Sequence, residues 1–163
     1  MSKLKAILFL SGVFLVSCFS AIFFEEYFRI TVRYLFRLLS GNNISFYGKG
    51  FLFPAASFII AFGLFCTLLS LLALRKKFLR LGLVILVFCL TVIGTSYLDC
   101  RLKIAVCTSC KDNKLFLHYT EIDYNFHFIF AFAVVLLFLR ITRLKESKKI
   151  AIWDFSSASA EEK

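Results

Sequence analysis

The chain has 163 residues, enough for one domain, and 60% of them are apolar. This fraction, together with a mean hydropathy of +0.83, excludes an ordinary soluble protein. The net charge of +10 at pH 7 comes from short basic clusters beside apolar stretches. Membrane topology and lipid headgroups account for such clusters, so we expect no nucleic-acid partner.

Four apolar stretches are long enough, or nearly so, to cross a bilayer as helices: residues 4–24, 51–74, 78–98 and 122–139. A bilayer core about 30 Å thick needs about 20 apolar helical residues, and lipid offers backbone groups no water to bond. The sequence therefore predicts an all-α integral membrane protein whose four transmembrane helices form an up-down-up-down bundle. This transmembrane domain covers residues 1–149 and precedes a tail of residues 150–163.

Basic residues mark one side of this bundle. They cluster before the first stretch, between the second and third, and after the fourth: Lys3, Lys5, Arg75, Lys76, Lys77, Arg140, Arg143, Lys145, Lys148 and Lys149. By the positive-inside rule, we expect both termini to be cytoplasmic, in a bacterial inner (plasma) membrane. The segments 25–50 and 99–121 are then exoplasmic loops. Within the first of them, two glycines predict that residues 45–50 form a short loop.

The N-terminal segment allows a second interpretation. Two lysines, a short apolar core and Leu15-Val16-Ser17-Cys18 resemble a bacterial lipoprotein signal with Cys18 as the lipidated residue. Processing there would remove the first helix and leave three. The apolar run continues past Cys18 to Phe24, which favours the uncleaved helix.

Residues 25–39, directly after the first stretch, have the pattern of an amphipathic helix. Arg29, Arg33 and Arg37 recur every four residues and so share one helical face, with Glu25 one turn before them. The other faces are apolar, so we expect this helix to lie along the outer interface or against the bundle. Its arginines then bind either lipid phosphates or an acidic partner or ligand.

The second outer loop carries three cysteines, Cys100, Cys107 and Cys110. Alternating apolar residues in 103–108 and 115–120 predict a small β-hairpin with the Cys107/Cys110 pair at its bend. Oxidation is permitted in an exoplasmic loop, so the first interpretation is a structural disulfide from Cys100 to Cys107 or Cys110. Closing so short a loop stabilises a fold by roughly 2–3 kcal/mol.

Two other interpretations of these cysteines are open. Cys107 and Cys110 have the spacing of a thiol–disulfide exchange pair, and the adjacent Lys111 favours a thiolate. In size, number of spans and an outward-facing cysteine pair, the chain resembles the bacterial disulfide-forming quinone reductases and the vitamin K epoxide reductases. This resemblance implies redox catalysis at the pair; those enzymes use two pairs, and this loop has one pair and a single cysteine. Alternatively Cys100, together with the pair and His118, holds a metal ion, with a spacing that matches no common zinc motif.

Catalytic and transport motifs are missing from the sequence. No acidic residue lies deep in a predicted span, which argues against ion-coupled transport. His127, one turn inside the fourth span, is the one candidate ionisable group there, and such a histidine more commonly bonds a neighbouring carbonyl or lies at the interface. Phosphate-binding Gly-rich loops, nucleophile elbows, metalloprotease motifs and paired catalytic carboxylates are not found.

We therefore expect a non-catalytic protein without a cofactor. The favoured function is an accessory or assembly subunit of a larger membrane complex, which contacts its partner through the exoplasmic loops. The alternatives are a membrane thiol–disulfide oxidoreductase that uses Cys107 and Cys110, and an immunity-type protein against a pore-forming toxin.

Overall fold

The computed structural model describes residues 3–41, 43–48, 54–106 and 115–158. Its α-helices are α1 Lys3–Leu39, α2 Ala56–Leu74, α3 Phe78–Val106 and α4 Tyr124–Ala158, with a 3-10 helix at Tyr119–Glu121. Two short strands are β1 Ile44–Tyr47 and β2 Leu115–His118. Each of the four α-helices contains a stretch long and apolar enough to cross a membrane, as the sequence predicts.

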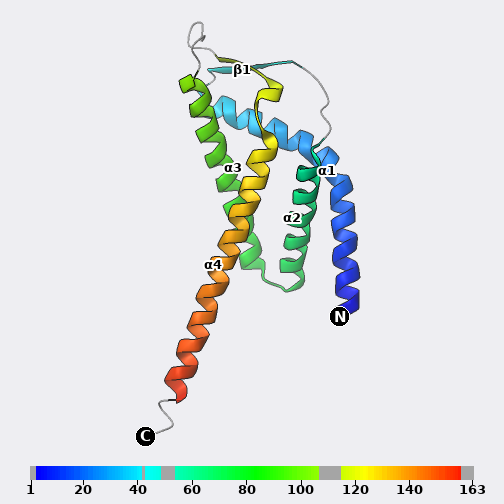
Figure 1. Ribbon diagram of the computed structural model, residues 1–163, viewed down its shortest axis with the longest axis vertical. Coiled ribbons are helices and arrows are strands. Elements are labelled where there is room, and N and C mark those ends of the chain that lie inside the picture. Colours follow the sequence, from blue (N-terminus) through cyan, green and yellow to red (C-terminus); the bar gives the residue numbers. More distant parts are fainter. Residues whose placement is uncertain (1–2, 42, 49–53, 107–114, 159–163) are drawn as a thin grey trace.

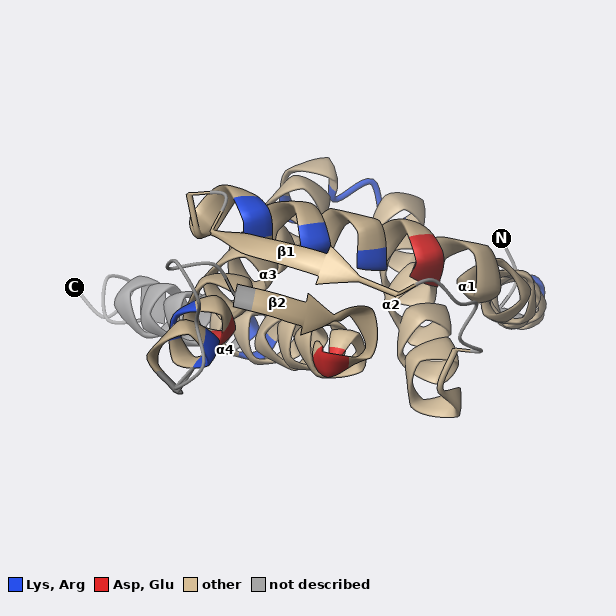
Figure 2. Cartoon of the chain, turned by 90° about the horizontal axis from the view of Figure 1, so that it is seen from above, with Lys and Arg blue, Asp and Glu red and all other residues tan. Residues whose placement is uncertain are grey.

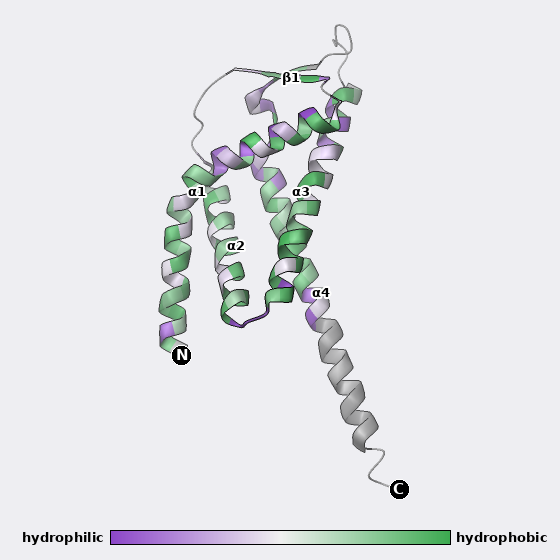
Figure 3. Ribbon diagram, turned by 180° about the vertical axis from the view of Figure 1, so that it is seen from behind, coloured by the Kyte–Doolittle hydropathy of each residue, from purple (hydrophilic) through white to green (hydrophobic). Residues whose placement is uncertain are grey.

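The helices form a bundle with a small sheet across one end (Figure 1). The tight turn between α2 and α3 lies at the same end as the N-terminus, here called the lower end. The opposite, upper end carries the sheet, the end of α3 and the start of α4. Figure 3 shows apolar residues along α2 and the middle of α3, with hydrophilic residues in the α2–α3 turn and along the second half of α1.

Helix α1 is longer than one membrane crossing requires. Its 37 residues extend about 55 Å at 1.5 Å per residue, against a hydrocarbon core of about 30 Å. Near the upper end the helix changes direction, and its second half crosses over the ends of the other helices (Figure 1). There Phe28, Val32 and Phe36 recur every four residues and are 6%, 0% and 0% exposed. Residues 25–39 are therefore helical, as predicted, and this half of α1 packs against the bundle by one apolar face.

The two strands form a parallel pair, with Ile44 opposite Leu115 and Tyr47 opposite His118. Residues 45–47, predicted as loop, are thus part of a strand. The two glycines mark only where a chain is free to turn, whereas strand formation here depends on a partner about seventy residues away in the chain.

The predicted hairpin of residues 103–108 with 115–120 is wrong. Residues 103–106 form the last turn of α3, and β2 pairs with β1 instead. Because residues 99–106 contain no Gly or Pro, nothing local ends the helix at the predicted span boundary. An alternating pattern only four residues long cannot distinguish a strand from a helix turn. Helix α4 likewise continues beyond its predicted span, to Ala158.

A cluster of phenylalanine rings joins all four helices. Phe128 of α4 lies at its centre and is 0% exposed. Its ring centroid is 5.5 Å from that of Phe28 in α1, 4.7 Å from Phe58 in α2 and 5.2 Å from Phe88 in α3. In a bilayer, helices associate through close packing of this kind, because lipid tails are as apolar as the side chains. The cluster therefore holds the upper half of the bundle together.

Candidate functional site

The row of arginines on α1 lies at the upper end, beside β1 (Figure 2). The structure gives its three members different surroundings. The Arg29 Nη2 lies 2.6 Å from Glu25 Oε1, and these side chains are only 7% and 2% exposed. The Arg29 guanidinium also lies over the Tyr124 ring, 5.6 Å from its centroid. Arg29 thus links α1 to α4 through these contacts.

Arg33 and Arg37 have a more open position. Arg33 Nε donates to the Arg29 backbone carbonyl oxygen at 3.3 Å, and its Nη2 lies 3.4 Å from Glu26 Oε1. The Arg37 guanidinium lies over the Phe46 ring of β1, 5.6 Å from its centroid. Both arginines line a groove of about 410 Å³ between α1 and β1. Its lining residues are Ile30, Arg33, Tyr34, Arg37, Phe46 and Gly48.

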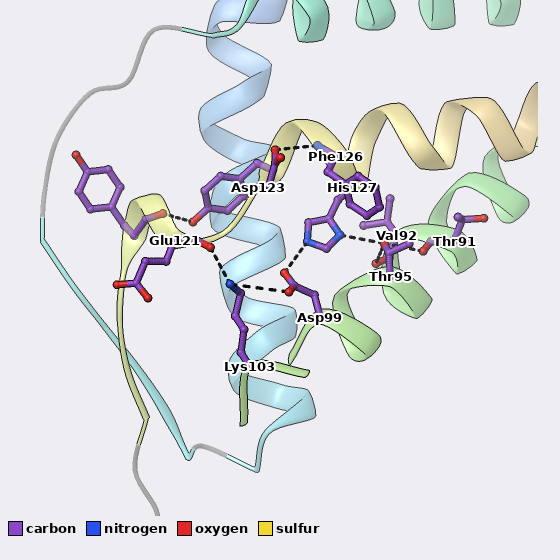
Figure 4. Close-up of polar contacts among 11 residues, drawn as sticks. Thr91, Val92, Thr95, Asp99, Lys103, Glu121, Asp123, Phe126 and His127 are labelled. Carbon is purple, nitrogen blue, oxygen red and sulfur yellow. Dashed lines mark hydrogen bonds and ion pairs between the residues drawn. The ribbon is translucent and has the colours of Figure 1, made fainter. Parts of the chain in front are cut away.

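A second polar cluster joins α3 to α4 (Figure 4). His127, 1% exposed, shares a hydrogen bond of 3.1 Å between its Nδ1 and Thr95 Oγ1, and its Nε2 lies 3.4 Å from Asp99 Oδ2. Asp99 in turn lies 3.9 Å from the Lys103 ammonium, which donates to the Glu121 backbone carbonyl oxygen at 2.8 Å. His127 thus contacts a hydroxyl and a carboxylate of the neighbouring helix and not the backbone carbonyl expected for it.

This cluster borders a second pocket, of about 360 Å³. It is lined by Thr95, Leu98, Asp99, Leu102, Lys103, Glu121, Asp123, Phe126 and Phe130. Asp123 accepts the backbone N–H of Phe126 at 3.0 Å and so caps the start of α4. The contacts of His127 with Thr95 and Asp99 therefore link α4 to α3.

The predicted cysteine site is described only in part. Cys100 is a free thiol, 0% exposed, with its Sγ 3.9 Å from the Phe36 backbone carbonyl oxygen. Cys107 and Cys110 lie outside the described residues, so thiol exchange at that pair stays a prediction. The predicted disulfide from Cys100 to one of them is not seen, since Cys100 has a free thiol in this structure. Thiol counting by mass spectrometry before and after reduction distinguishes these possibilities.

His118 and Cys18 lie within regular structure. His118 Nδ1 lies 2.6 Å from Thr120 Oγ1, and its backbone N–H donates to the Glu121 carboxylate at 2.9 Å, which caps the 3-10 helix. Within the described parts of the chain, no three metal-binding side chains gather. The predicted metal set includes two cysteines outside those parts, so it also stays a prediction. Cys18 is inside α1, half-buried against α2, with its Sγ 3.9 Å from the Ile59 carbonyl oxygen.

Two features of the upper end were missed in the sequence. Glu25 belongs to a segment predicted as an exoplasmic loop, yet its side chain is buried. Its spacing of four from Arg29 was the available signal for an ion pair. The approach of Asp99 to His127 has no local signal, because the two residues are 28 positions apart.

Comparison of the chain with protein-family models, curated proteins and solved structures finds no match. The case for a function therefore rests on the geometry of its own residues.

Proposed function

We propose that this protein is a small non-catalytic subunit that assists or assembles a larger membrane complex. In this proposal the bundle crosses the membrane in alternating directions, with both termini in the cytoplasm. The cap, defined as residues 25–39 of α1 with β1 and β2, lies on the exoplasmic side and contacts the partner.

An exposed apolar row on the cap carries this proposal. Tyr27, Ile30, Tyr34 and Leu38 are 70%, 51%, 64% and 61% exposed. Their spacing of three and four residues places them along one face of the helix. This face belongs to the half of α1 that crosses the upper end, beyond the length needed to span hydrocarbon. Tyrosine beside arginine is typical of the cores of protein interfaces, so the row suits a protein partner.

The distribution of basic residues supports the orientation. The cluster 75–77 is in the turn at the lower end, with the N-terminus and its lysines. At the upper end, Arg29 and Arg33 lie within ion-pair distance of Glu25 and Glu26. Basic residues in short connections favour the cytoplasmic side, which agrees with a cytoplasmic lower end.

Co-isolation tests this function. The full chain is extracted from its native membrane in mild detergent, and its complexes are weighed by native mass spectrometry. We expect a complex of defined stoichiometry, which Tyr34→Ala weakens by about tenfold or more if Tyr34 is an interface anchor. The matched control is Phe19→Ala, which truncates an aromatic side chain 77% exposed on the first half of α1 and leaves the complex intact. A monodisperse monomer from the wild-type chain contradicts the proposal.

A further inference from the structure

We infer that the groove between α1 and β1 is a binding site for the phosphate group of an anionic phospholipid, with Arg33 and Arg37 as its ligands. The site is formed within one chain, and its apolar edge shares Ile30 and Tyr34 with the row proposed to face the protein partner. In this inference the three arginines have different roles. The buried Arg29 pairs with Glu25, and Arg33 and Arg37 bind the anion.

The charge of the groove favours an anion. Two guanidinium groups line it, and no carboxylate is among its lining residues. Arg37 has no carboxylate partner in the described parts of the chain, and its contact there is the face of the Phe46 ring. Stacking on a ring leaves the N–H groups at the edge of the guanidinium plane free, and those groups match phosphate oxygens in pairs.

Neighbouring groups hold both arginines toward the groove. Arg33 Nε donates to the Arg29 carbonyl oxygen at 3.3 Å, which fixes the position of the Arg33 side chain. The ion-pair partner of Arg33, Glu26, has a side chain that is 46% exposed. Gly48 follows β1 with a φ of +90°, and a Cβ there would lie 2.5 Å from His118 Nε2. The end of β1 is thus held tightly against β2, and this close pairing positions Phe46 beneath Arg37.

The shape and place of the groove favour a lipid as the source of the phosphate. A volume of about 410 Å³ is in the range of small-molecule sites. Ile30 and Tyr34 form an apolar edge, 51% and 64% exposed, beside the two cations. This combination suits the glycerol and upper acyl chain of a phospholipid next to its charged headgroup. The upper end of the bundle is also where headgroups lie when α2 and α3 span the hydrocarbon.

Lipid retention tests the site. The full chain is reconstituted in nanodiscs of phosphatidylcholine with phosphatidylglycerol, released into mild detergent, and weighed with its bound lipid by native mass spectrometry. We expect the wild-type protein to retain phosphatidylglycerol in preference to phosphatidylcholine. We expect R33Q and R37Q each to retain at least about tenfold less phosphatidylglycerol than the wild type. R37K, which keeps the charge but loses the paired N–H geometry, should fall between R37Q and wild type.

The matched control is R101Q. Arg101 is also stacked on an aromatic ring at 5.3 Å, that of Tyr97 in α3, but it does not line the groove. Equal lipid retention by R37Q and R101Q overturns the inference.

Inorganic phosphate is added as a competitor in a parallel experiment. Displacement of the lipid by inorganic phosphate at an equal concentration would show a free-phosphate site and overturn the assignment to a lipid. Circular dichroism checks that each variant is folded. If R37Q is not folded, the lipid retention of R37K is compared with that of the wild type in its place.

Discussion

Replacing Phe128 by alanine tests whether the phenylalanine cluster holds the bundle together. The ring is 0% exposed and lies within 6.1 Å, centroid to centroid, of five other rings. Phe→Ala substitutions in close-packed cores cost about 3–5 kcal/mol through lost contacts and the cavity that remains. Since lipid tails supply no hydrophobic driving force between helices, we expect the lower end of this range, about 3 kcal/mol.

The free energy of unfolding is measured by titrating the protein from mild-detergent micelles with sodium dodecyl sulfate and following helix content. The control is Phe130→Ala, two residues along α4, where the ring is 44% exposed and stacks on Phe126 at 5.6 Å. This change removes the same atoms from a side chain that is only partly buried, so we expect a loss below about 1 kcal/mol. Equal losses for the two variants would refute the central role of Phe128.

The same titration tests two further features. Glu25→Ala leaves Arg29 buried without its partner, so we expect a loss of about 3–5 kcal/mol. Glu26→Ala removes a carboxylate that is 46% exposed and should cost less than about 1 kcal/mol; similar losses for both would contradict a buried ion pair. Gly63→Ala places a Cβ 2.8 Å from side chains of α1, and we expect a loss of about 1–3 kcal/mol. Gly82→Ala has nothing within 4 Å of the added Cβ and should stabilise its helix slightly. An unchanged midpoint for Gly63→Ala would show that α1 and α2 do not pack closely there.

Local patterns predicted the helices better than their ends. The four apolar stretches were correct because the free energy of placing about 20 apolar residues in lipid is a sum over neighbours in the chain. The third predicted span ends at residue 98, whereas helix α3 continues eight residues further, to Val106. Hydropathy falls where the helix leaves the hydrocarbon, but the backbone hydrogen bonds need not end there.

By itself, then, the sequence determined that the protein has four membrane-length helices and an amphipathic segment after the first of them. Only the tertiary structure decided which of three equally spaced arginines is buried, and that β1 pairs with β2. Both depend on contacts between residues distant in the chain: Arg29 lies over Tyr124, and Phe46 lies under Arg37 because its strand is held by β2. Residue spacing specifies a helical face, but what covers that face is set by the packing of the other helices and the sheet.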